Sequence, residues 1–184
     1  YYDFELKSSF FLKDNNTFGI LFRYIDQYNY YIFEVSNEGK GFKRVRKFVK
    51  GIPKILDFKN DGGFVKEIWY NMKIRAQQSF IFIYLTDRNE NDLEKFYELQ
   101  FKIIDNELVH GTIAYASSGI SYLLLDNISV NPLNCINFDD SEKNLIAPLT
   151  PTCPRYFENF KNGFSERWKI IEPNFDFNGA FLWL

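Results

Sequence analysis

The chain has 184 residues, 46% of them hydrophobic and 25% charged, which is enough to bury a sizeable core in about one domain. Its 22 Lys and Arg against 24 Asp and Glu give a net charge of −2, so there is no broad positive field to hold nucleic acid or an anionic membrane. Aromatic residues make up 20% of the chain, with 21 Phe and 12 Tyr, and this favours strands over helices.

The chain begins at Tyr1 within a strand-like pattern and has neither an initiator Met nor a signal peptide. Its longest apolar run, Phe80–Leu85, is far too short to cross a bilayer, so we expect no transmembrane segment. We interpret the sequence as a fragment of a larger protein with flanking domains.

The first part of the chain predicts strands separated by turns. Tyr1–Leu12 alternates in part, Lys13–Asn16 has turn chemistry, and Phe18–Phe22 resumes an extended pattern. A second turn at Asp26–Asn29 leads to Tyr30–Val35, which is apolar on both faces. This pattern is typical of a central strand in a packed sandwich, and we expect the segment to be among the most buried.

The next segment, Phe42–Lys50, alternates cationic and apolar residues. It predicts a strand with one solvated, cationic face. One interpretation is an edge strand whose charges block pairing with other sheets.

The strongest turn signal is Asn60–Gly63, because both glycines accept positive φ without a steric penalty. A hairpin or a long connection is expected there. The remaining strands are expected at Lys54–Lys59, before this turn, and at Trp69–Arg75, Phe80–Thr86, Tyr97–Ile104, His110–Ser117 and Ser121–Val130 after it. Together these make about ten strands, with no segment of sustained helical periodicity, and predict an all-β sandwich.

After Pro132 the composition changes. Asn134–Arg155 contains Pro148, Pro151 and Pro154 and predicts a linker or wrapping loop, while Phe157–Leu184 is aromatic again but too short to form its own core. We therefore divide the chain into a sandwich (1–133), a linker or wrapping loop (134–155) and a segment (156–184) that docks on the sandwich or begins a following module.

Several segments follow one another in a recognisable order: FGILFRY at Phe18–Tyr24, then Asp26, Tyr30-Tyr31 and Phe33, the strand opening at Trp69-Tyr70, GTIAYA at Gly111–Ala116 and LDNISV at Leu125–Val130. Together they resemble the concanavalin A-like lectin/glucanase superfamily, with the closest likeness to thrombospondin C-terminal and laminin G-like modules. The likeness runs through Tyr1–Cys135. It implies an antiparallel jelly-roll sandwich of an extracellular protein that binds glycans or proteins, frequently with calcium at a sandwich edge. Phe157–Phe160 with Trp168 is similar to the opening strand of such modules.

The resemblance leads us to expect a noncatalytic extracellular adhesion or recognition module. The competing hypotheses are a carbohydrate-active enzyme of the same superfamily and a structural spacer. Glu90, Asp92 and Glu94 have the E-x-D-x-E spacing of the glucanase branch, but polar and charged neighbours favour a solvated loop. The single His110 has no Cys or second His partner, so a structural role is favoured over a general base or ligand.

Calcium needs several oxygen atoms at one point. Asp14 and Asp126, with Asp3, Asn15 and Asn127 near them, are the candidate ligands if the first and last strands pair. The alternative is that Asp14 serves turn chemistry and Asp126 binds backbone amides.

Arg44, Arg46 and Lys47 of the cationic strand are candidate ligand-binding residues for a sulfated glycan, as the laminin G-like resemblance implies; the edge-strand interpretation remains open. Tyr28, Trp69 and Tyr122 are aromatic residues whose exposure the sequence does not determine.

The two cysteines, Cys135 and Cys153, are candidates for a disulfide that stabilises the irregular segment by about 3 kcal/mol, or for pairing outside the fragment. Asn15-Asn16-Thr17 and Asn127-Ile128-Ser129 match glycosylation sequons.

Overall fold

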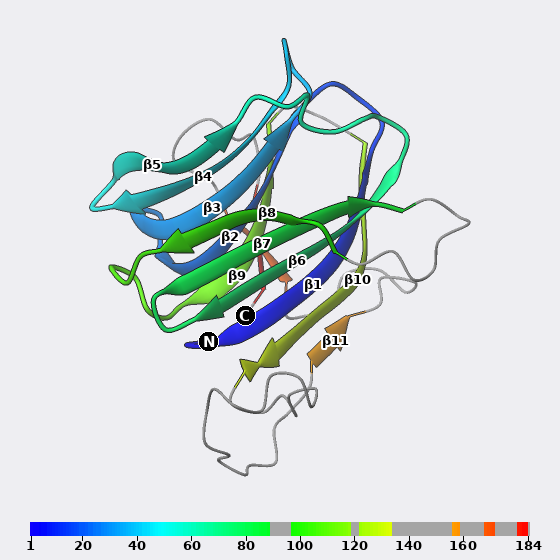
Figure 1. The fold of residues 1–184 in the computed structure, drawn as a ribbon. Helices are drawn as coiled ribbons and strands as arrows, with labels where there is room; N and C mark the ends of the chain where they lie inside the picture. Colours follow the sequence, from blue (N-terminus) through cyan, green and yellow to red (C-terminus); the bar gives the residue numbers. More distant parts are fainter. Residues whose placement is uncertain (89–96, 119–121, 134–155, 159–167, 172–179, 184) are drawn as a thin grey trace.

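The structure, a computed structural model, describes residues 1–88, 97–118, 122–133, 156–158, 168–171 and 180–183. These residues form two facing antiparallel sheets and contain no α-helix (Figure 1). Accordingly, the described part of the chain holds no helix of the length and apolarity that a membrane span requires. The predicted all-β sandwich is confirmed.

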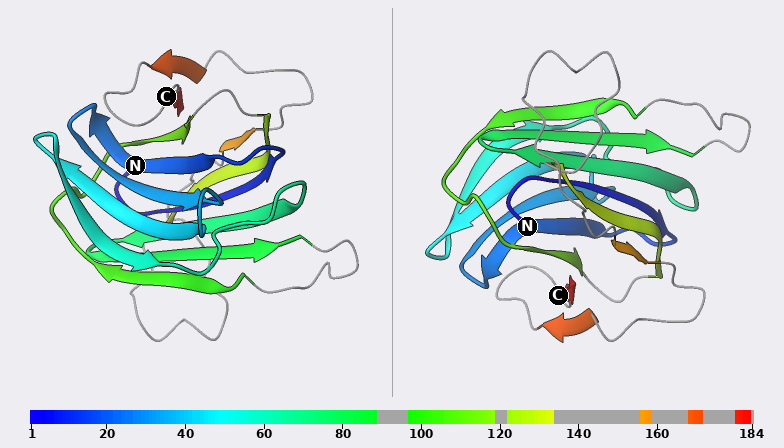
Figure 2. Two further views of the ribbon diagram at one scale, coloured as in Figure 1. Left: turned by 90° about the horizontal axis from the view of Figure 1, so that it is seen from above. Right: turned by 90° about the horizontal axis from the view of Figure 1, so that it is seen from below.

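Two views from above and below show the layers facing each other (Figure 2). The six-stranded sheet has the order β11 (Tyr156–Glu158), β10 (Leu123–Pro132), β1 (Phe4–Leu12), β6 (Trp69–Gln77), β7 (Phe80–Asp87), β8 (Leu99–Ile104). The seven-stranded sheet has the order β12 (Trp168–Ile171), β13 (Ala180–Trp183), β9 (Thr112–Ser117), β2 (Thr17–Asp26), β3 (Asn29–Ser36), β4 (Phe42–Val49), β5 (Ile52–Lys59).

The core lies between the sheets and follows from the period of two along each strand. On β6 the buried positions alternate with half-exposed ones through the whole strand, so every second side chain enters the core. Aromatic side chains join the layers: the Phe10 ring of β1 lies 4.6 Å from the Phe18 ring of β2 and 5.4 Å from the Tyr70 ring of β6, between ring centroids. These aromatic side chains are part of the interior that joins the two sheets.

The central-strand prediction for Tyr30–Val35 is confirmed, because all its residues are buried in β3. The expectation of a solvated face on the cationic strand is wrong, since Val45–Phe48 of β4 are all buried. The edge-strand interpretation is wrong as well, because β4 lies between β3 and β5, and β5 is the edge strand on that side of the sheet.

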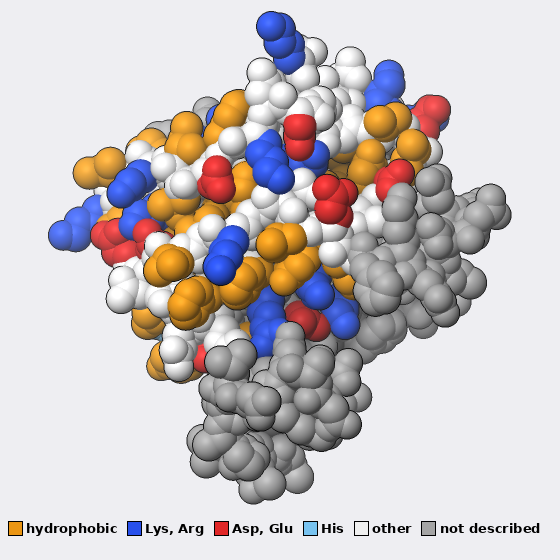
Figure 3. Space-filling model, viewed as in Figure 1, with side chains coloured by type: hydrophobic (Ala, Val, Ile, Leu, Met, Phe, Trp, Pro, Cys, Tyr) orange, Lys and Arg blue, Asp and Glu red, His pale blue; other side chains and the backbone are white. Residues whose placement is uncertain are grey.

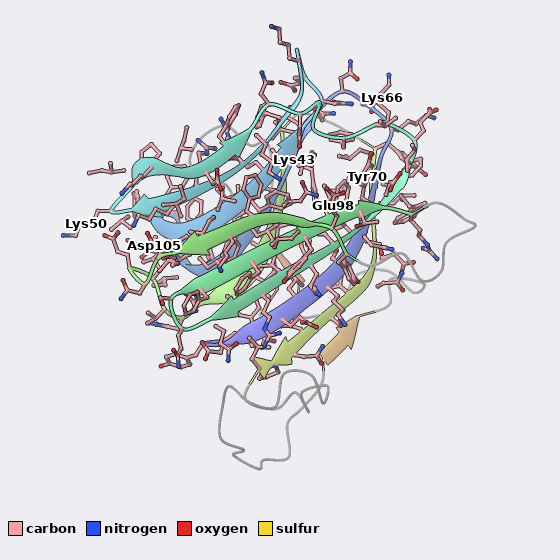
Figure 4. All side chains as sticks on the ribbon, viewed as in Figure 1. Lys43, Lys50, Lys66, Tyr70, Glu98 and Asp105 are labelled. Atoms are coloured by element: carbon pink, nitrogen blue, oxygen red, sulfur yellow. The ribbon has the colours of Figure 1, made fainter. Side chains whose placement is uncertain are left out.

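The connection at Asn60–Gly63 is a long one, because it carries the chain from β5 in one sheet to β6 in the other. Gly41 and Gly63, both at positive φ, let this connection approach the turn after β3 closely. A Cβ atom at Gly63 would lie only 1.7 Å from the backbone oxygen of Ser36. Across this contact the Lys43 ammonium, labelled in Figure 4, donates to Asp61 at 2.8 Å.

The last described strands extend both sheets. β11 pairs with β10, and β13 pairs with β9. This pairing is what a segment docked on the sandwich would make, and the division of the chain at 133 and 155 remains a prediction.

Candidate functional site

The outer face of the six-stranded sheet carries a row of aromatic side chains on β7. Ile81, Ile83 and Leu85 point into the core and are buried. The alternate residues Phe80, Phe82 and Tyr84 therefore lie on the outer face, where Phe80 is 41% exposed. The ring centroids of Phe80 and Phe82 are 6.3 Å apart and their planes differ by only 14°. In Figure 3 hydrophobic side chains gather over this part of the sheet, with Lys and Arg beside them.

The strand register places a polar side chain opposite each ring. On β6 the partners of Phe80, Phe82 and Tyr84 are Gln77, Arg75 and Lys73. On the other side β8 places Lys102 opposite Phe82. Each ring thus has a nitrogen donor beside it, and this set of residues on β6, β7 and β8 is called the aromatic face below.

Cationic groups lie over several of these rings. The Lys73 ammonium is 4.3 Å from the centroid of the Tyr84 ring and 4.8 Å from that of Tyr97. The Lys102 ammonium lies 5.9 Å from the Phe82 ring. Such contacts stabilise the sheet by themselves and also hold the charged groups next to the rings.

A second aromatic pair lies farther along the same face. The rings of Phe11 on β1 and Trp69 on β6 are 5.7 Å apart, and Leu124 of β10, 39% exposed, is opposite Phe11 in the register. Between this pair and the aromatic face, the Ser9 hydroxyl donates to the Asn71 side-chain oxygen at 2.8 Å. A polar pair in which Ser9 is buried thus separates the second aromatic pair from the aromatic face.

This combination suits a ligand with apolar surfaces and many hydroxyl groups. An aromatic ring offers a flat apolar face, and the neighbouring amide, guanidinium and ammonium groups donate hydrogen bonds. Sugar rings have both properties, with C–H groups on one face and hydroxyls around the rim. The aromatic face is thus a candidate glycan-binding surface.

The predicted ligand-binding residues Arg44 and Arg46 lie on the other sheet, where both bind the same buried carboxylate. Glu34 of β3 is opposite Arg44 in the register, and Arg46 is its diagonal neighbour. Arg44 binds the two carboxylate oxygens at 2.7 and 3.0 Å, and Arg46 binds them at 2.6 and 2.7 Å. Both guanidinium groups already hold a carboxylate, and their role in ligand binding remains a prediction.

Lys47, the third predicted residue, lies on the opposite face of the sheet from Arg44 and Arg46. Its ammonium lies 2.5 Å from the carboxylates of both Asp105 and Glu107, just beyond β8, where Figure 4 labels Asp105. Asp105 also accepts a hydrogen bond of 2.5 Å from the hydroxyl of Tyr31, which in turn accepts from the Leu108 amide. This network joins β3 and β4 of one sheet to the chain that leaves the other.

Asp105 gives the network a predictable pH dependence. Burial by itself raises the pKa of this carboxyl, but hydrogen bonds from Lys47 and Tyr31 outweigh it, so the pKa lies below its ordinary value. Because the folded-state pKa is depressed, the contribution is present above the unfolded-state value of about 4 and is lost as the pH falls through the folded-state pKa.

We expect Asp105→Asn to lower the free energy of unfolding by about 2 kcal/mol at pH 7, because the neutral amide leaves Lys47 and Tyr31 with a weaker partner. The difference from the unchanged chain should shrink near pH 3. Urea unfolding at the two pH values measures it, with Asp57→Asn as the control, because Asp57 is exposed and bonds only the neighbouring amide among the contacts described. An equal loss at both pH values would contradict the assignment.

The predicted calcium ligands lie at separate points. Asp14 accepts from the amide of Tyr122, before β10 begins, and Asp126 lies within β10 and accepts from the amide of Asn127. Within the described ranges, no group of three or more His, Cys, Asp and Glu side chains is placed to hold a metal ion. These bonds are the backbone contacts named as the alternative, and calcium binding stays a prediction.

Some of the other residues singled out in the sequence lie within the described ranges and some lie outside them. The Glu90, Asp92 and Glu94 motif and the cysteines Cys135 and Cys153 lie outside the described residues. The His110 ring packs on the ring of Tyr2, with 5.3 Å between centroids. Tyr28 and Tyr122 are 45% and 54% exposed; Tyr28 lies in the turn between β2 and β3, and Tyr122 comes directly before β10.

No protein family model matches the chain, and no curated protein matches it. Among solved structures it is similar to the carbohydrate binding module CBM66 from Bacillus subtilis, with a TM-score of 0.57 and 19% identity over 71% of this chain and 76% of that chain. A mutant of the GH43 protein BlXynB from Bacillus licheniformis gives a TM-score of 0.45 and 13% identity over 68% of this chain and 24% of that chain. The first likeness shows a shared β-sandwich fold, and the second is too loose to support an inference.

Proposed function

We propose that this chain is a noncatalytic module that binds glycans on its aromatic face. The observation that carries the proposal is the row of Phe80, Phe82 and Tyr84 with a polar β6 residue opposite each ring. A fold shared with a carbohydrate binding module supports the same class of ligand.

The wider setting is also a proposal. The module belongs to a larger secreted or surface protein, acts in adhesion or recognition, and is related most closely to laminin G-like and thrombospondin C-terminal modules. The sequence resemblance supports this setting, and protein ligands are a second possible class. Calcium held at Asp14 or Asp126 is part of the same proposal, so each binding measurement is made with calcium and with a chelator.

The first test is a glycan array probed with the purified chain. Binding to one or more glycans is the expected result. Absence of binding to every glycan, with and without calcium, would refute the proposed function.

The second test assigns binding to the aromatic face. Phe82→Ala and Tyr84→Ala are each expected to weaken glycan binding about tenfold, because each removes one apolar stacking surface. Titration calorimetry against the best glycan from the array measures the change. The control is Phe58→Ala, which removes a 48% exposed ring from β5 in the other sheet and should leave affinity unchanged.

Circular dichroism of each variant checks that the fold is retained. A loss of glycan affinity in Phe58→Ala as large as that in Phe82→Ala, or full affinity in both β7 variants, would show that the binding site is not on the aromatic face.

A further inference from the structure

We infer that the glycan bound here is an extended chain that lies along β7 with several sugar units in contact, as opposed to a single terminal sugar. This inference rests on the proposed function and specifies its ligand. It follows from how the aromatic face is laid out.

The layout is linear. Outward-facing residues on a strand recur at every second position, which is about 6.7 Å along the strand. The measured distance of 6.3 Å between the Phe80 and Phe82 ring centroids agrees with that repeat, and Tyr84 continues it by one more step. The Tyr97 ring lies near the Tyr84 end of this row, because the Lys73 ammonium is within 5 Å of the ring centroids of both residues.

The polar groups repeat with the rings. Gln77, Arg75 and Lys73 follow one another along β6 in step with Phe80, Phe82 and Tyr84 on β7, because antiparallel pairing matches every second residue on the same face. The unit of one ring plus one donor group is therefore presented repeatedly in one direction. A surface with a repeating unit is complementary to a ligand with a repeating unit, and a polysaccharide chain is such a ligand.

A site for one terminal sugar has a different form. Recognition of a small ligand uses a concave site in which a few polar groups converge on one point. In the part of the sheet that the structure describes, the rings and donors are spread along a strand and project from the outer face of a sheet. A row of this length can contact several sugar units of a polysaccharide, whereas a single terminal sugar would reach only part of it.

The test is a length series. Cello-, xylo-, chito- and fructo-oligosaccharides of one, two, four and six units are titrated into the protein by calorimetry. For at least one series, affinity is expected to rise about tenfold or more from one to four units, because longer ligands reach more than one ring. Equal affinity for one and six units in every series that binds would overturn the inference and leave the proposed function standing.

Variants at the end of the row sharpen the result. Phe80→Ala should weaken the six-unit ligand about tenfold and leave the shortest ligand that binds nearly unchanged, while Phe82→Ala weakens both. Phe58→Ala is again the matched control, with melting by circular dichroism to show that each variant folds. Equal losses for the short and long ligands in Phe80→Ala would overturn the extended arrangement. If no oligosaccharide and no array glycan binds, both the inference and the proposed function fail.

Discussion

Gly63→Ala is expected to lower the free energy of unfolding by about 3 kcal/mol or more, because the new methyl group meets backbone that has no room to move. The Cβ atom would lie 1.7 Å from the Ser36 carbonyl oxygen and 3.0 Å from the Phe42 nitrogen. Gly63 also has φ of +66°, which costs a residue with a Cβ about 1 kcal/mol. Urea unfolding followed by circular dichroism measures the change.

The matched control is Gly39→Ala. Gly39 has nearly the same φ, +61°, but nothing lies within 4 Å of a Cβ atom placed there. Its replacement should cost only the conformational penalty of about 1 kcal/mol. If both variants lost the same stability, the close approach between the β5–β6 connection and the turn after β3 would contribute nothing.

The strand pattern was predictable because it depends on local chemistry. Each expected strand from Tyr1 to Val130 has a counterpart among β1 to β10, and the turns fall at the expected polar and glycine-containing positions. The burial of Tyr30–Val35 followed from its apolar residues on both faces. These features need only a period of two and turn residues, which the sequence displays directly.

Contacts between distant segments were not predictable in the same way. The sequence does not show that Arg44 and Arg46 both bind Glu34 on the neighbouring strand, and their role in ligand binding remains a prediction. Glu34 was the available signal, since an acid in an otherwise apolar central strand needs a cationic partner when it is buried. The register that brings the three together is set by pairing of β3 with β4.

The aromatic face was missed because Phe80–Leu85 is apolar at every position. A run with no polar residues does not reveal which face is outside. The signal lay on the paired strand, where Lys73 and Arg75 alternate with buried Met72 and Ile74 and so identify the outer face. Trp69, by contrast, was singled out in the sequence as an aromatic residue of undetermined exposure, and its ring lies beside that of Phe11 on the same sheet.

Arg23 is the second site with a large expected effect. Its side chain is fully buried and its backbone has φ of +48°, at a point where the pairing of β2 with both neighbours is irregular. The guanidinium group donates to the backbone oxygens of Leu108 at 3.1 Å, Gln78 at 2.8 Å and Tyr2 at 3.4 Å. The Asp3 carboxylate lies 3.8 Å away. One side chain therefore joins the start of the chain, the β6–β7 turn and the segment after β8.

We expect Arg23→Met to lower the free energy of unfolding by about 3 to 5 kcal/mol. Methionine fills similar space but leaves three backbone oxygens without this donor. Burial lowers the pKa of Arg23, with Tyr31, Asp3 and Asp105 acting in the opposite direction. Thermal and urea unfolding measure the loss, and Arg88→Met, at an exposed position just after β7, should change stability by only about 0.5 kcal/mol or less.

The change in unfolding free energy on Arg23→Met depends on two opposing effects, the loss of hydrogen bonds and the relief of the desolvation cost of a buried charge. Removing a guanidinium group from the interior also removes its desolvation cost, and some buried charges are replaced by apolar residues with a gain in stability. Here we expect the lost hydrogen bonds to outweigh the relieved desolvation cost, because the partners of the guanidinium group are backbone oxygens that stay in place when the side chain changes. Arg23→Lys keeps the charge and some of the donors, so it should recover part of the loss. A variant Arg23→Met as stable as the unchanged chain would show that desolvation cancels these bonds, and that other contacts hold this end of the sandwich together.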